Sequence, residues 1–530
     1  MTALGWATVA ACSLAAALAL LRWLRVAQRE HYLPGSVTRF ALRWWGQDPA
    51  TGFAFLVALA GLVLAWRWPG AALAAALVVA FGPPGLGLQG RTSPLAWTRR
   101  LTTLAAVTVV LAVAAVVVAA LLGQGPVGAG AVALAVPVLV DLGSSVTGPF
   151  ETVAARTYVR RARERLQKVG PTVVAITGSY GKTSTKGYVA HLVAGSKTVV
   201  ASPASFNNRA GLARAVNENL ADGTDVFVAE MGTYGPGEIA ELSSWLVPDV
   251  AVITAIGPVH LERFRSEDRI VAAKAEILPA AGAVVLNVDD ERLARLADRA
   301  EERGQRVRRV SSESPDADVY VGSRHPSGDG RVVGDEAAPT LMVDGFEVGP
   351  SAPGAQPGNV ACAVAVALEL GVPVAEIGRR IPTLPTAPHR LEAGAGAGGF
   401  LVLDDTYNAN PAGAAAALVA LAATAPPSGR KVVVTPGMVE LGPVQVERNT
   451  AFGRAAAEVA DDLVVVGRTN RRALLAGATG GARADETRGD RQPVRCVVVV
   501  NRDEAVAWVR DHLGPGDIVL YENDLPDHYP

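Results

Sequence analysis

The hydrophobic pattern divides the chain at about residue 150. The first part is almost continuously apolar and contains five runs, each close to the roughly 20 residues that a helix needs to cross a bilayer. These runs cover about 3–21, 51–66, 69–83, 101–122 and 127–143. The second and third are short and are joined only by the letters WRWP, which is compatible with one tight helical hairpin. The pattern predicts a membrane α-helical domain over residues 1–150 with about five spans; a soluble domain of buried helices is the alternative.

Basic residues concentrate in alternate connections between these runs. Those that follow the first, third and fifth runs are Arg22, Arg25, Arg29, Arg39, Arg43, Arg91, Arg99, Arg100, Arg156, Arg160, Arg161, Arg163, Arg165 and Lys168. The other connections carry only Arg67 or, at 123–127, no charge. Because basic loops stay on the cytoplasmic side, we expect a multi-pass protein of the cell membrane with its N-terminus outside. A basic juxtamembrane linker over 151–170 would lead to cytoplasmic domains, and the first run would be an anchor, since later spans follow it.

Beyond residue 170, short β-branched runs alternate with helical stretches. PTVVAITG (171–178) is followed by a helical stretch from Lys182 to about Ala194, which indicates a strand, a loop and a helix. Further strand runs are DVFVAEMG (225–232), DVAVITAIG (249–257), AVVLNVD (283–289) and, from near residue 400, FLVLDD, KVVVTPG, DLVVVG, RCVVVV and DIVLYE. The segment 311–358 is rich in Ser, Pro, Gly and Asp and should be irregular or meandering. Strands that alternate with helices predict parallel sheets, in two α/β units, with ligands at the carboxyl ends of the strands.

Composition and charge argue against several kinds of site. The net charge of −1 gives no reason to expect nucleic acid as a partner, and anionic headgroups explain the basic clusters beside the spans. Cys12, Cys362 and Cys496 are far apart in the sequence and lack metal-ligand spacing. The sequence therefore suggests neither a disulfide framework nor a zinc site.

One glycine-rich loop, GSYGKTS (178–184), carries the first sign of chemistry. It follows a strand and opens a helix, but it is shorter than the common G-x-x-x-x-G-K-[ST] loop. Backbone N–H groups of such a turn, aided by the helix N-terminus, can point at phosphate. Lys182 would neutralise the β- and γ-phosphates of ATP, and the Thr183 hydroxyl would bind Mg²⁺. The residues expected to bind ATP here are Gly178, Ser179, Tyr180, Gly181, Lys182, Thr183 and Ser184. The plain alternative is a glycine turn that caps a helix.

Further motifs make a family resemblance visible. They are SFNNRAGL (205–212), AEMGTYGPGEIAEL (229–242), ITAIGPVHLERFRSEDRIVAAKAEIL (253–278), LNVDD (286–290), PHRLE (388–392), DDTYNANP (404–411) and GMVELG (437–442). Together with the short loop they resemble the Mur ligases over roughly residues 170–521. Within that family they are most similar to the type that adds D-alanyl-D-alanine to the nucleotide-linked muramoyl tripeptide. The resemblance implies a central P-loop, ATP-binding domain over 171–385 and a Rossmann-like C-terminal domain over 386–530.

The resemblance also implies a metal site. Glu230, at a strand end, and His260 look like the family's further Mg²⁺ ligands beside Thr183; an oxygen ligand suits Mg²⁺ better, so Glu230 fits more easily. Lys274 resembles the lysine that members of this group carbamoylate, which turns a cation into a carboxylate able to hold a second Mg²⁺. ATP and two Mg²⁺ ions are thus the implied cofactors, with catalytic roles for Lys182, His260 and Lys274. Without the resemblance, Glu230 would be a structural or solvated carboxylate and Lys274 a surface lysine on a helix.

The remaining matches concern the nucleotide and the substrates. Arg390 resembles an arginine that reaches the γ-phosphate from the hinge and acts in catalysis, a role that suits its fixed charge and forked donors. Asn287 resembles an adenine contact and Asp405 a ribose contact. The residues expected on the substrate side are Asn207, Asn208, Tyr407, Asn408 and Asn410.

The implied reaction forms an amide bond. A substrate carboxylate attacks the γ-phosphate of ATP, giving an acyl phosphate and ADP, and an incoming amine then displaces phosphate. Lys182 and two Mg²⁺ ions would offset the repulsion between the anionic nucleophile and the triphosphate. Because Arg390 and Asp405 lie beyond the hinge, the C-terminal domain would close over the cleft.

Two departures from the family leave the substrates open. The usual enzyme begins with a domain that holds the uridine nucleotide, and here the apolar runs stand in its place. The family's C-terminal KGS is replaced by YENDLPDHYP (521–530). We expect the acceptor to be a small-molecule or lipid-linked peptide precursor of the muramoyl type, at the inner face of the membrane. The alternatives are a ligase that makes a polyglutamate or another peptide product, and a catalytically idle membrane scaffold; the short loop disfavours a P-loop transporter ATPase.

Overall fold

The structure is a computed structural model in which most of the chain is described. It describes residues 2–530 apart from 47–48, 89–94, 204–205, 323–338, 353–354, 386–390, 408–409, 425–428, 481–492, 526–528 and 530. Two expected site residues, Arg390 and Asn408, lie outside the described residues. The chain forms two compact units, Met1–Arg156 with Leu525–Pro530, and Thr157–Asp524.

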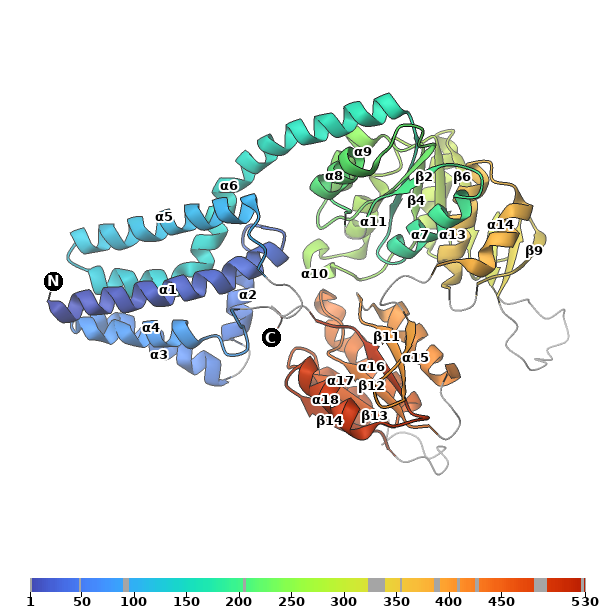
Figure 1. The fold of residues 1–530 in the computed structure, drawn as a ribbon. Coiled ribbons are helices and arrows are strands. Elements are labelled where there is room, and N and C mark those ends of the chain that lie inside the picture. Colours follow the sequence, from blue (N-terminus) through green and yellow to red (C-terminus); the bar gives the residue numbers. More distant parts are fainter. Residues whose placement is uncertain are drawn as a thin grey trace. The chain divides into compact units, whose positions relative to one another are not determined.

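The first unit is built of helices (Figure 1). These are α1 (Ala3–Arg29), α2 (Ser36–Trp45), α3 (Pro49–Ala65), η1 (Pro69–Ala72), α4 (Leu73–Phe81), α5 (Arg99–Leu121) and α6 (Gly125–Val169). Helix α6 continues into the second unit, so the expected linker over 151–170 is largely helical. An ion pair between Arg160 and Glu164, 3.7 Å apart at i and i+4, supports this last part of the helix.

Three described helices, α1, α5 and α6, are long and apolar enough to cross a membrane. Helices α2 and α3, bent by 109°, add a fourth candidate if they count as one span. The structure thus gives three or four candidates where about five spans were expected. The difference arises because α3 has 17 residues and α4 only nine. Helices α3 and α4 pack closely, since a Cβ atom on Gly61 would come within 2.8 Å of Ala74 Cβ.

Buried polar side chains in the first unit satisfy helix ends. The Arg22 guanidinium donates to the carbonyl oxygens of Val79, Ala80 and Gly82 at 2.6 to 3.2 Å, where α4 ends. The Asp141 carboxylate accepts hydrogen bonds from the backbone N–H groups of Val37 and Thr38, in the first turn of α2, at 3.2 and 2.8 Å. Both are groups that a helix leaves without an internal partner. Asp141 therefore has a structural role at the start of α2.

The second unit contains two sheets. The nine-stranded sheet of the central domain has the order β2-β3-β1-β4-β5-β6-β7-β8-β9. Its strands are β1 (Thr172–Thr177), β2 (Val199–Ala201), β3 (Val226–Glu230), β4 (Val250–Ile253), β5 (Ala283–Asn287), β6 (Arg306–Ser311), β7 (Val319–Gly322), β8 (Thr340–Val343) and β9 (Phe346–Pro350). Strands β1 to β7 are parallel, as expected, and β7 to β9 form an antiparallel meander in the segment 311–358, which was expected to be irregular or meandering.

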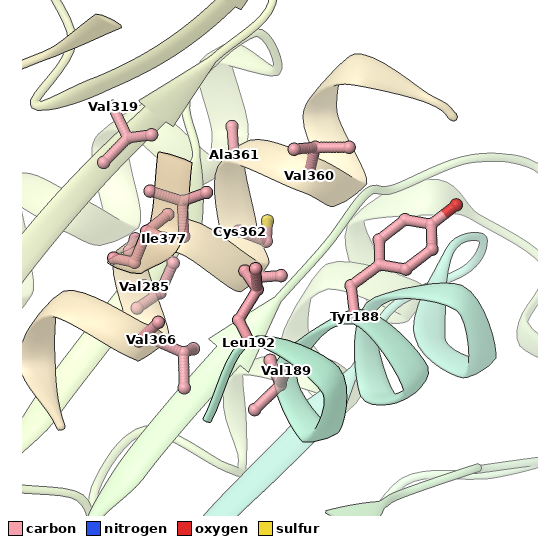
Figure 2. Packing of buried hydrophobic residues seen from close by; sticks show 14 of the residues in the cluster. Tyr188, Val189, Leu192, Val285, Val319, Val360, Ala361, Cys362, Val366 and Ile377 are labelled. Atoms are coloured by element: carbon pink, nitrogen blue, oxygen red, sulfur yellow. The ribbon is translucent and has the colours of Figure 1, made fainter. Parts of the chain in front are cut away.

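Helices cover both faces of this sheet. They are α7 (Lys182–Val193), α8 (Arg209–Asn219), α9 (Glu238–Leu246), α10 (Leu261–Phe264), α11 (Glu267–Ala275), α12 (Glu291–Glu302), α13 (Pro357–Glu369), α14 (Val374–Arg380) and η2 (Ile381–Thr383). Figure 2 shows one apolar layer, in which Val189 and Leu192 of α7 meet Cys362 and Val366 of α13. The other layer contains α8, α9 and α12. Strands buried on both faces explain the continuous apolar runs in the sequence.

The six-stranded sheet of the C-terminal domain has the order β10-β11-β15-β12-β13-β14. Its strands are β10 (Glu392–Ala395), β11 (Leu401–Asp405), β12 (Lys431–Thr435), β13 (Asp462–Val466), β14 (Arg495–Val499) and β15 (Ile518–Glu522). All pairings are parallel except that of β10. Its helices are α15 (Pro411–Thr424), η3 (Gly442–Val444), α16 (Gln445–Val459), α17 (Arg471–Gly480) and α18 (Arg502–His512). The five strand runs expected after residue 400 are thus confirmed as β11 to β15.

Candidate functional site

The loop between β1 and α7 adopts a conformation that requires glycine at two points. Gly178 (φ +156°) and Gly181 (φ +79°) have positive φ angles. A Cβ atom at Gly178 would come within 2.0 Å of Thr254 Oγ1, and one at Gly181 within 2.0 Å of Asn359 Oδ1. The two glycines therefore allow close approach of neighbouring segments, and the loop leads directly into the N-terminus of α7.

Side chains of the loop are tied to their surroundings. Lys182 Nζ donates to the Gly178 carbonyl oxygen at 2.8 Å, so the ammonium lies over the start of the loop. Ser179 Oγ donates to the Gly257 carbonyl oxygen at 3.1 Å. The Tyr180 hydroxyl is buried and has no hydrogen-bond partner in the described part of the chain. Burial raises the pKa of Tyr180, so its hydroxyl stays protonated and able to donate.

Glu230, at the end of β3, is the centre of a buried charged cluster. Its Oε2 accepts hydrogen bonds from Thr183 Oγ1 and Lys186 Nζ, both at 3.0 Å, and Asn207 Nδ2 donates to its Oε1 at 3.4 Å. Burial by itself would raise the pKa of Glu230, but the charges of Lys186 and Lys182, with these hydrogen bonds, lower it. Glu230 is therefore an ionised carboxylate beside the loop.

Lys186 is a site residue that the sequence interpretation missed. Its side chain is only 7% exposed and forms an ion pair with Glu230. The available signal was its position four residues after Lys182 on a helix that starts there, because residues i and i+4 share one face of a helix. A buried lysine in contact with a buried carboxylate fixes where that carboxylate points.

Lys274, on α11, is brought to the same place. It is 5% exposed, and its ammonium group makes no hydrogen bond or ion pair within the described residues. Burial, and next the charge of nearby Lys182, lower the pKa of Lys274 well below its ordinary value. The structure thus contradicts the alternative of a surface lysine, and it describes an amine that is readily neutral.

The donor set fits the Mg²⁺ that the resemblance implies. Thr183 Oγ1 and Glu230 Oε2 are 3.0 Å apart, so two hard oxygen donors can reach one cation beside the loop. Within the described residues, no three His, Cys, Asp or Glu side chains cluster as a metal site. Of the expected ligands, only Glu230 and His260 are of these types.

His260 lies just before α10, with φ +61° and a side chain that is 30% exposed. Its Nδ1 forms a short hydrogen bond with Glu440 Oε2, from the turn between β12 and η3. The Tyr234 ring packs edge-on against the imidazole, with ring centroids 5.1 Å apart. His260 is therefore held by side chains from two other segments, and the sequence interpretation gave no role to either.

The other expected residues of the central domain have defined surroundings. Asn208 Oδ1 accepts from Gly211 N–H at 3.0 Å and caps α8, so half of this amide has a structural task. Asn287 ends β5, and its Oδ1 accepts from Asp289 N–H at 3.1 Å. A Cβ atom on Gly358 would lie 3.0 Å from Asn287 Nδ2, which puts this amide beside the first turn of α13.

The expected residues of the C-terminal domain follow the end of β11. Asp405 Oδ1 accepts from Leu391 N–H at 3.3 Å. Tyr407 is 43% exposed, and Asn410 is buried and caps α15 through Gly413 N–H. Asn410 thus has a structural partner, which sequence alone did not indicate.

A buried acid, Glu522, was also missed. It ends β15 in register with Asp405, and neither of its carboxylate oxygens has a hydrogen-bond partner in the part of the chain described. Burial, and next the charge of Asp405, raise the pKa of Glu522 well above its ordinary value. The adjacent Asn523 has φ +65°, a backbone conformation that favours glycine.

Comparisons with known proteins fit this architecture. The profile described as "Mur ligase middle domain" matches residues 176–343, and the one described as "Mur ligase, glutamate ligase domain" matches residues 389–521. The UDP-N-acetylmuramoyl-tripeptide:D-alanyl-D-alanine ligase of Mycobacterium tuberculosis (strain ATCC 25618 / H37Rv) is 36% identical over 377 residues, which cover 66% of this chain and 70% of the relative. The Escherichia coli (strain K12) protein of that name is 30% identical over 368 residues, covering 68% and 78%.

Solved structures share the fold of the second unit. The chain is similar to MurF from Acinetobacter baumannii, with a TM-score of 0.57 and 26% identity over 70% of this chain and 77% of that one. It is also similar to the MurF ligase of Thermotoga maritima in complex with ADP, with a TM-score of 0.54 and 25% identity over 70% and 80%. Two family profiles in order, the similar relatives and the loop geometry together show that this chain belongs to the Mur ligase family, whose members are ATP-dependent ligases.

Proposed function

We propose that the protein forms an amide bond at the expense of ATP, through an acyl phosphate, on a cell-envelope precursor of the muramoyl-peptide type. The observation that carries this proposal is the cluster at the ends of β1 and β3. There, Lys182 and Thr183 of the short loop lie beside Lys186 and Glu230. The names of the relatives support a muramoyl peptide as the carboxylate substrate and a D-alanyl dipeptide as the amine.

In the proposed first step, a substrate carboxylate oxygen attacks the γ-phosphorus, and the bond to the β,γ-bridging oxygen breaks to release ADP. Backbone N–H groups of the loop and Lys182 hold the phosphates. Thr183 and Glu230 would hold Mg²⁺, which when bound lowers the repulsion between the two anions. In the second step, the amine nitrogen attacks the acyl carbon, inorganic phosphate leaves and the nitrogen loses a proton.

Lys274 would contribute as a carbamate. A neutral lysine amine can attack CO₂, forming an N–C bond and releasing a proton, and the product is a carboxylate. The burial of Lys274 and its neighbour Lys182 favour the neutral amine that this reaction needs. The carbamate would then supply an oxygen ligand for a second Mg²⁺ and offset the charge of Lys182.

The first unit would hold the enzyme in the cell membrane, with the second unit in the cytoplasm and the N-terminus outside. Helices α1, α5 and α6 are long and apolar enough to span a bilayer. Many of the large apolar side chains of this unit are exposed, among them Leu14, Val63, Val110 and Phe81, with 66 to 81% of each accessible. Such an apolar exterior is unfavourable in water and suits lipid.

A membrane-held ligase favours a lipid-linked acceptor. An acceptor on a polyprenyl carrier shares the plane of the membrane with the enzyme, which raises its effective concentration. The competing explanation is that the helices only keep an ordinary nucleotide-peptide ligase near its pathway. Polyglutamate or other peptide synthesis, and a catalytically idle scaffold, are further alternatives; the intact loop cluster argues against the last.

The test uses the full-length protein in lipid nanodiscs with ATP, Mg²⁺ and D-alanyl-D-alanine. Phosphate release and the amide product are measured with a lipid-linked muramoyl peptide and with its soluble uridine-nucleotide counterpart. We expect kcat/KM for the lipid-linked acceptor to be at least about tenfold higher, a gain within the range that tethering provides. Equal or faster turnover of the soluble substrate would contradict the lipid-linked acceptor and leave the ATP chemistry intact. Absence of turnover with every muramoyl acceptor would contradict the proposed substrate class.

A further inference from the structure

The turn after β12 contains an acidic residue, Glu440, that the proposed reaction does not use. Its φ of +63° lies in the left-handed region, which is uncommon for a residue other than glycine. Two residues further on, Gly442 approaches the central domain so closely that a Cβ atom would come within 3.1 Å of Glu262 N. Backbone conformations of this kind persist only where the surrounding structure holds them, and they concentrate at functional sites.

The carboxylate of Glu440 contacts two side chains of the central domain. Its Oε2 accepts a hydrogen bond from His260 Nδ1, and its Oε1 lies 3.7 Å from Arg263 Nη2. The Glu440 carbonyl oxygen also accepts from Glu262 N–H at 3.4 Å. The Tyr234 ring lies between the two partners, edge-on to His260 and with the Arg263 guanidinium 4.8 Å above its centre. The imidazole is therefore fixed on one side by an acid and on another by an aromatic ring.

This contact decides which nitrogen of His260 can bind a cation. When Nδ1–H donates to a carboxylate, the neutral imidazole carries its lone pair on Nε2. Nε2 of His260 has no hydrogen-bond partner within the residues described, so it is available. Histidines that bind metals commonly donate their other N–H to a carboxylate, which fixes both the tautomer and the ring orientation.

Apolar packing joins the same two segments. Val444, at the end of η3, packs against a small cluster formed by Leu261, Phe264, Ile270 and Ala273 on α10 and α11. Lys274 directly follows Ala273 on α11. The segment 440–444 thus supports both the histidine and the helix that carry two of the expected metal-binding side chains.

We infer that Glu440 is a positioning residue that orients His260 as a metal ligand, so that cation affinity depends on the contact of segment 440–444 with α10 and α11. The inference rests on the proposed function, because it takes His260 Nε2 to face Mg²⁺ beside the nucleotide. It goes further by giving the C-terminal domain a part in building the metal site of the central domain.

The experiment measures Mn²⁺ binding directly, with full-length protein in nanodiscs, ADP present and no peptide substrate. Free Mn²⁺ is read by electron paramagnetic resonance for wild type, Glu440→Ala, Glu440→Gln and the control Glu447→Gln, an exposed acid on α16. Loss of such a supporting carboxylate weakens metal binding by about 10- to 100-fold, and we expect that range for Glu440→Ala. Glu440→Gln keeps an acceptor oxygen and should lose less, while Glu447→Gln should match wild type.

A double-mutant cycle separates positioning from general damage. If Glu440 acts through His260, Glu440→Ala should weaken Mn²⁺ binding no further in a His260→Ala background. With ATP turnover as a second readout, KM for the cation should rise while kcat at saturating cation stays within a few-fold of wild type. Unchanged Mn²⁺ affinity in folded Glu440→Ala and Glu440→Gln, or an equal further loss in the His260→Ala background, would overturn the inference. Wild type that binds no Mn²⁺ with ADP would overturn the proposed function as well.

Discussion

The carboxyl edges of the two sheets differ in whether their buried acids have partners. We call the edge of the central sheet, at Glu230, the matched edge and the edge of the C-terminal sheet, at Glu522, the unmatched edge. At the edge of the central sheet, buried Glu230 has Lys186, Thr183 and Asn207 as partners and remains ionised. At the edge of the C-terminal sheet, Glu522 lies beside Asp405, and its oxygens have no hydrogen-bond partner within the described chain. Burying a charge is costly unless it is paired. Glu230 can therefore stay ionised in the folded protein, whereas ionisation of Glu522 would destabilise the fold.

The difference shows which part of the family's chemistry transfers to this chain. The edge with matched charges carries the motifs that resemble the Mur ligases, from GSYGKTS to VAAKAEI. The other edge, at Glu522, carries the family-like motif DDTYNANP together with the ending YENDLPDHYP, where the family pattern is lost. The ATP chemistry of the family can therefore be inferred for this chain from several side chains in contact. The identity of the amine substrate cannot be inferred in the same way.

The largest effect is expected for a substitution of Lys182 at the matched edge. Lys182→Ala removes the cation that we propose acts on the transferring phosphoryl group, and amide formation should fall by about 10²-fold or more. Initial rates of product formation measure the change, with Lys197→Ala, in the turn after α7, as the control. Amide formation at the wild-type rate would contradict the assignment of the loop.

A second variant removes the buried amine at the same edge. Lys274→Ala should be nearly inactive, and short carboxylates or high bicarbonate should restore part of the activity by returning an anion to the site. Nuclear magnetic resonance of protein equilibrated with ¹³C-bicarbonate should show a carbamate signal in wild type that the variant lacks. An unmodified lysine together with an active Lys274→Ala variant would remove this residue from the site.

The smallest effect is expected at the unmatched edge, where Glu522 should make the thermal stability depend on pH. Because the pKa of Glu522 is raised in the folded protein, the folded state keeps its proton to a higher pH than the unfolded state. Its contribution to stability is therefore present in acid and is lost as pH rises through the raised pKa. Glu522→Gln, which cannot ionise, should match wild type near pH 4 and exceed it by about 2–4 °C in Tm near pH 8, if about 1 kcal/mol is recovered.

Thermal scans of wild type, Glu522→Gln and Glu447→Gln across this pH range measure that effect. A Glu522→Gln transition that follows wild type at every pH would mean that Glu522 has a partner at neutral pH, and the contrast between the two edges would fail.

Much of the architecture follows from sequence pattern. Strands buried on both faces appear as continuous β-branched runs, which is why β1, β3, β4, β5 and β11 to β15 were predictable. Strand β2 has only three residues and is too short to show a pattern, and β6 (RVRRVS) has polar letters at four of its six positions, so it lacks the apolar pattern of a buried strand. The sequence already indicated that the runs of α3 and α4 are short and compatible with a hairpin, but it did not show that α4 has only nine residues, which is why the structure gives three or four candidate spans.

The candidate site was predictable where a motif lies within one segment. The loop follows from its own pattern, and Glu230 and Lys274 were expected from the family resemblance of the motifs that contain them; the structure adds that they gather at one edge. Contacts between segments far apart in the chain were not predictable. Glu440 lies 180 residues after His260, and Glu522 becomes unusual only when β15 is paired with β11. The tasks of Asn208 and Asn410 as helix caps likewise depend on where α8 and α15 begin.

The central claim is that the matched edge activates a carboxylate by transferring phosphate to it. The most direct measurement uses full-length protein, ATP, D-alanyl-D-alanine and a muramoyl peptide whose reacting carboxylate is labelled with ¹⁸O. If the carboxylate oxygen attacks the γ-phosphorus, each amide bond formed leaves one labelled oxygen in the released phosphate, and mass spectrometry of that phosphate detects it. The account predicts labelled phosphate in proportion to amide product. Amide product accompanied by unlabelled phosphate would contradict it.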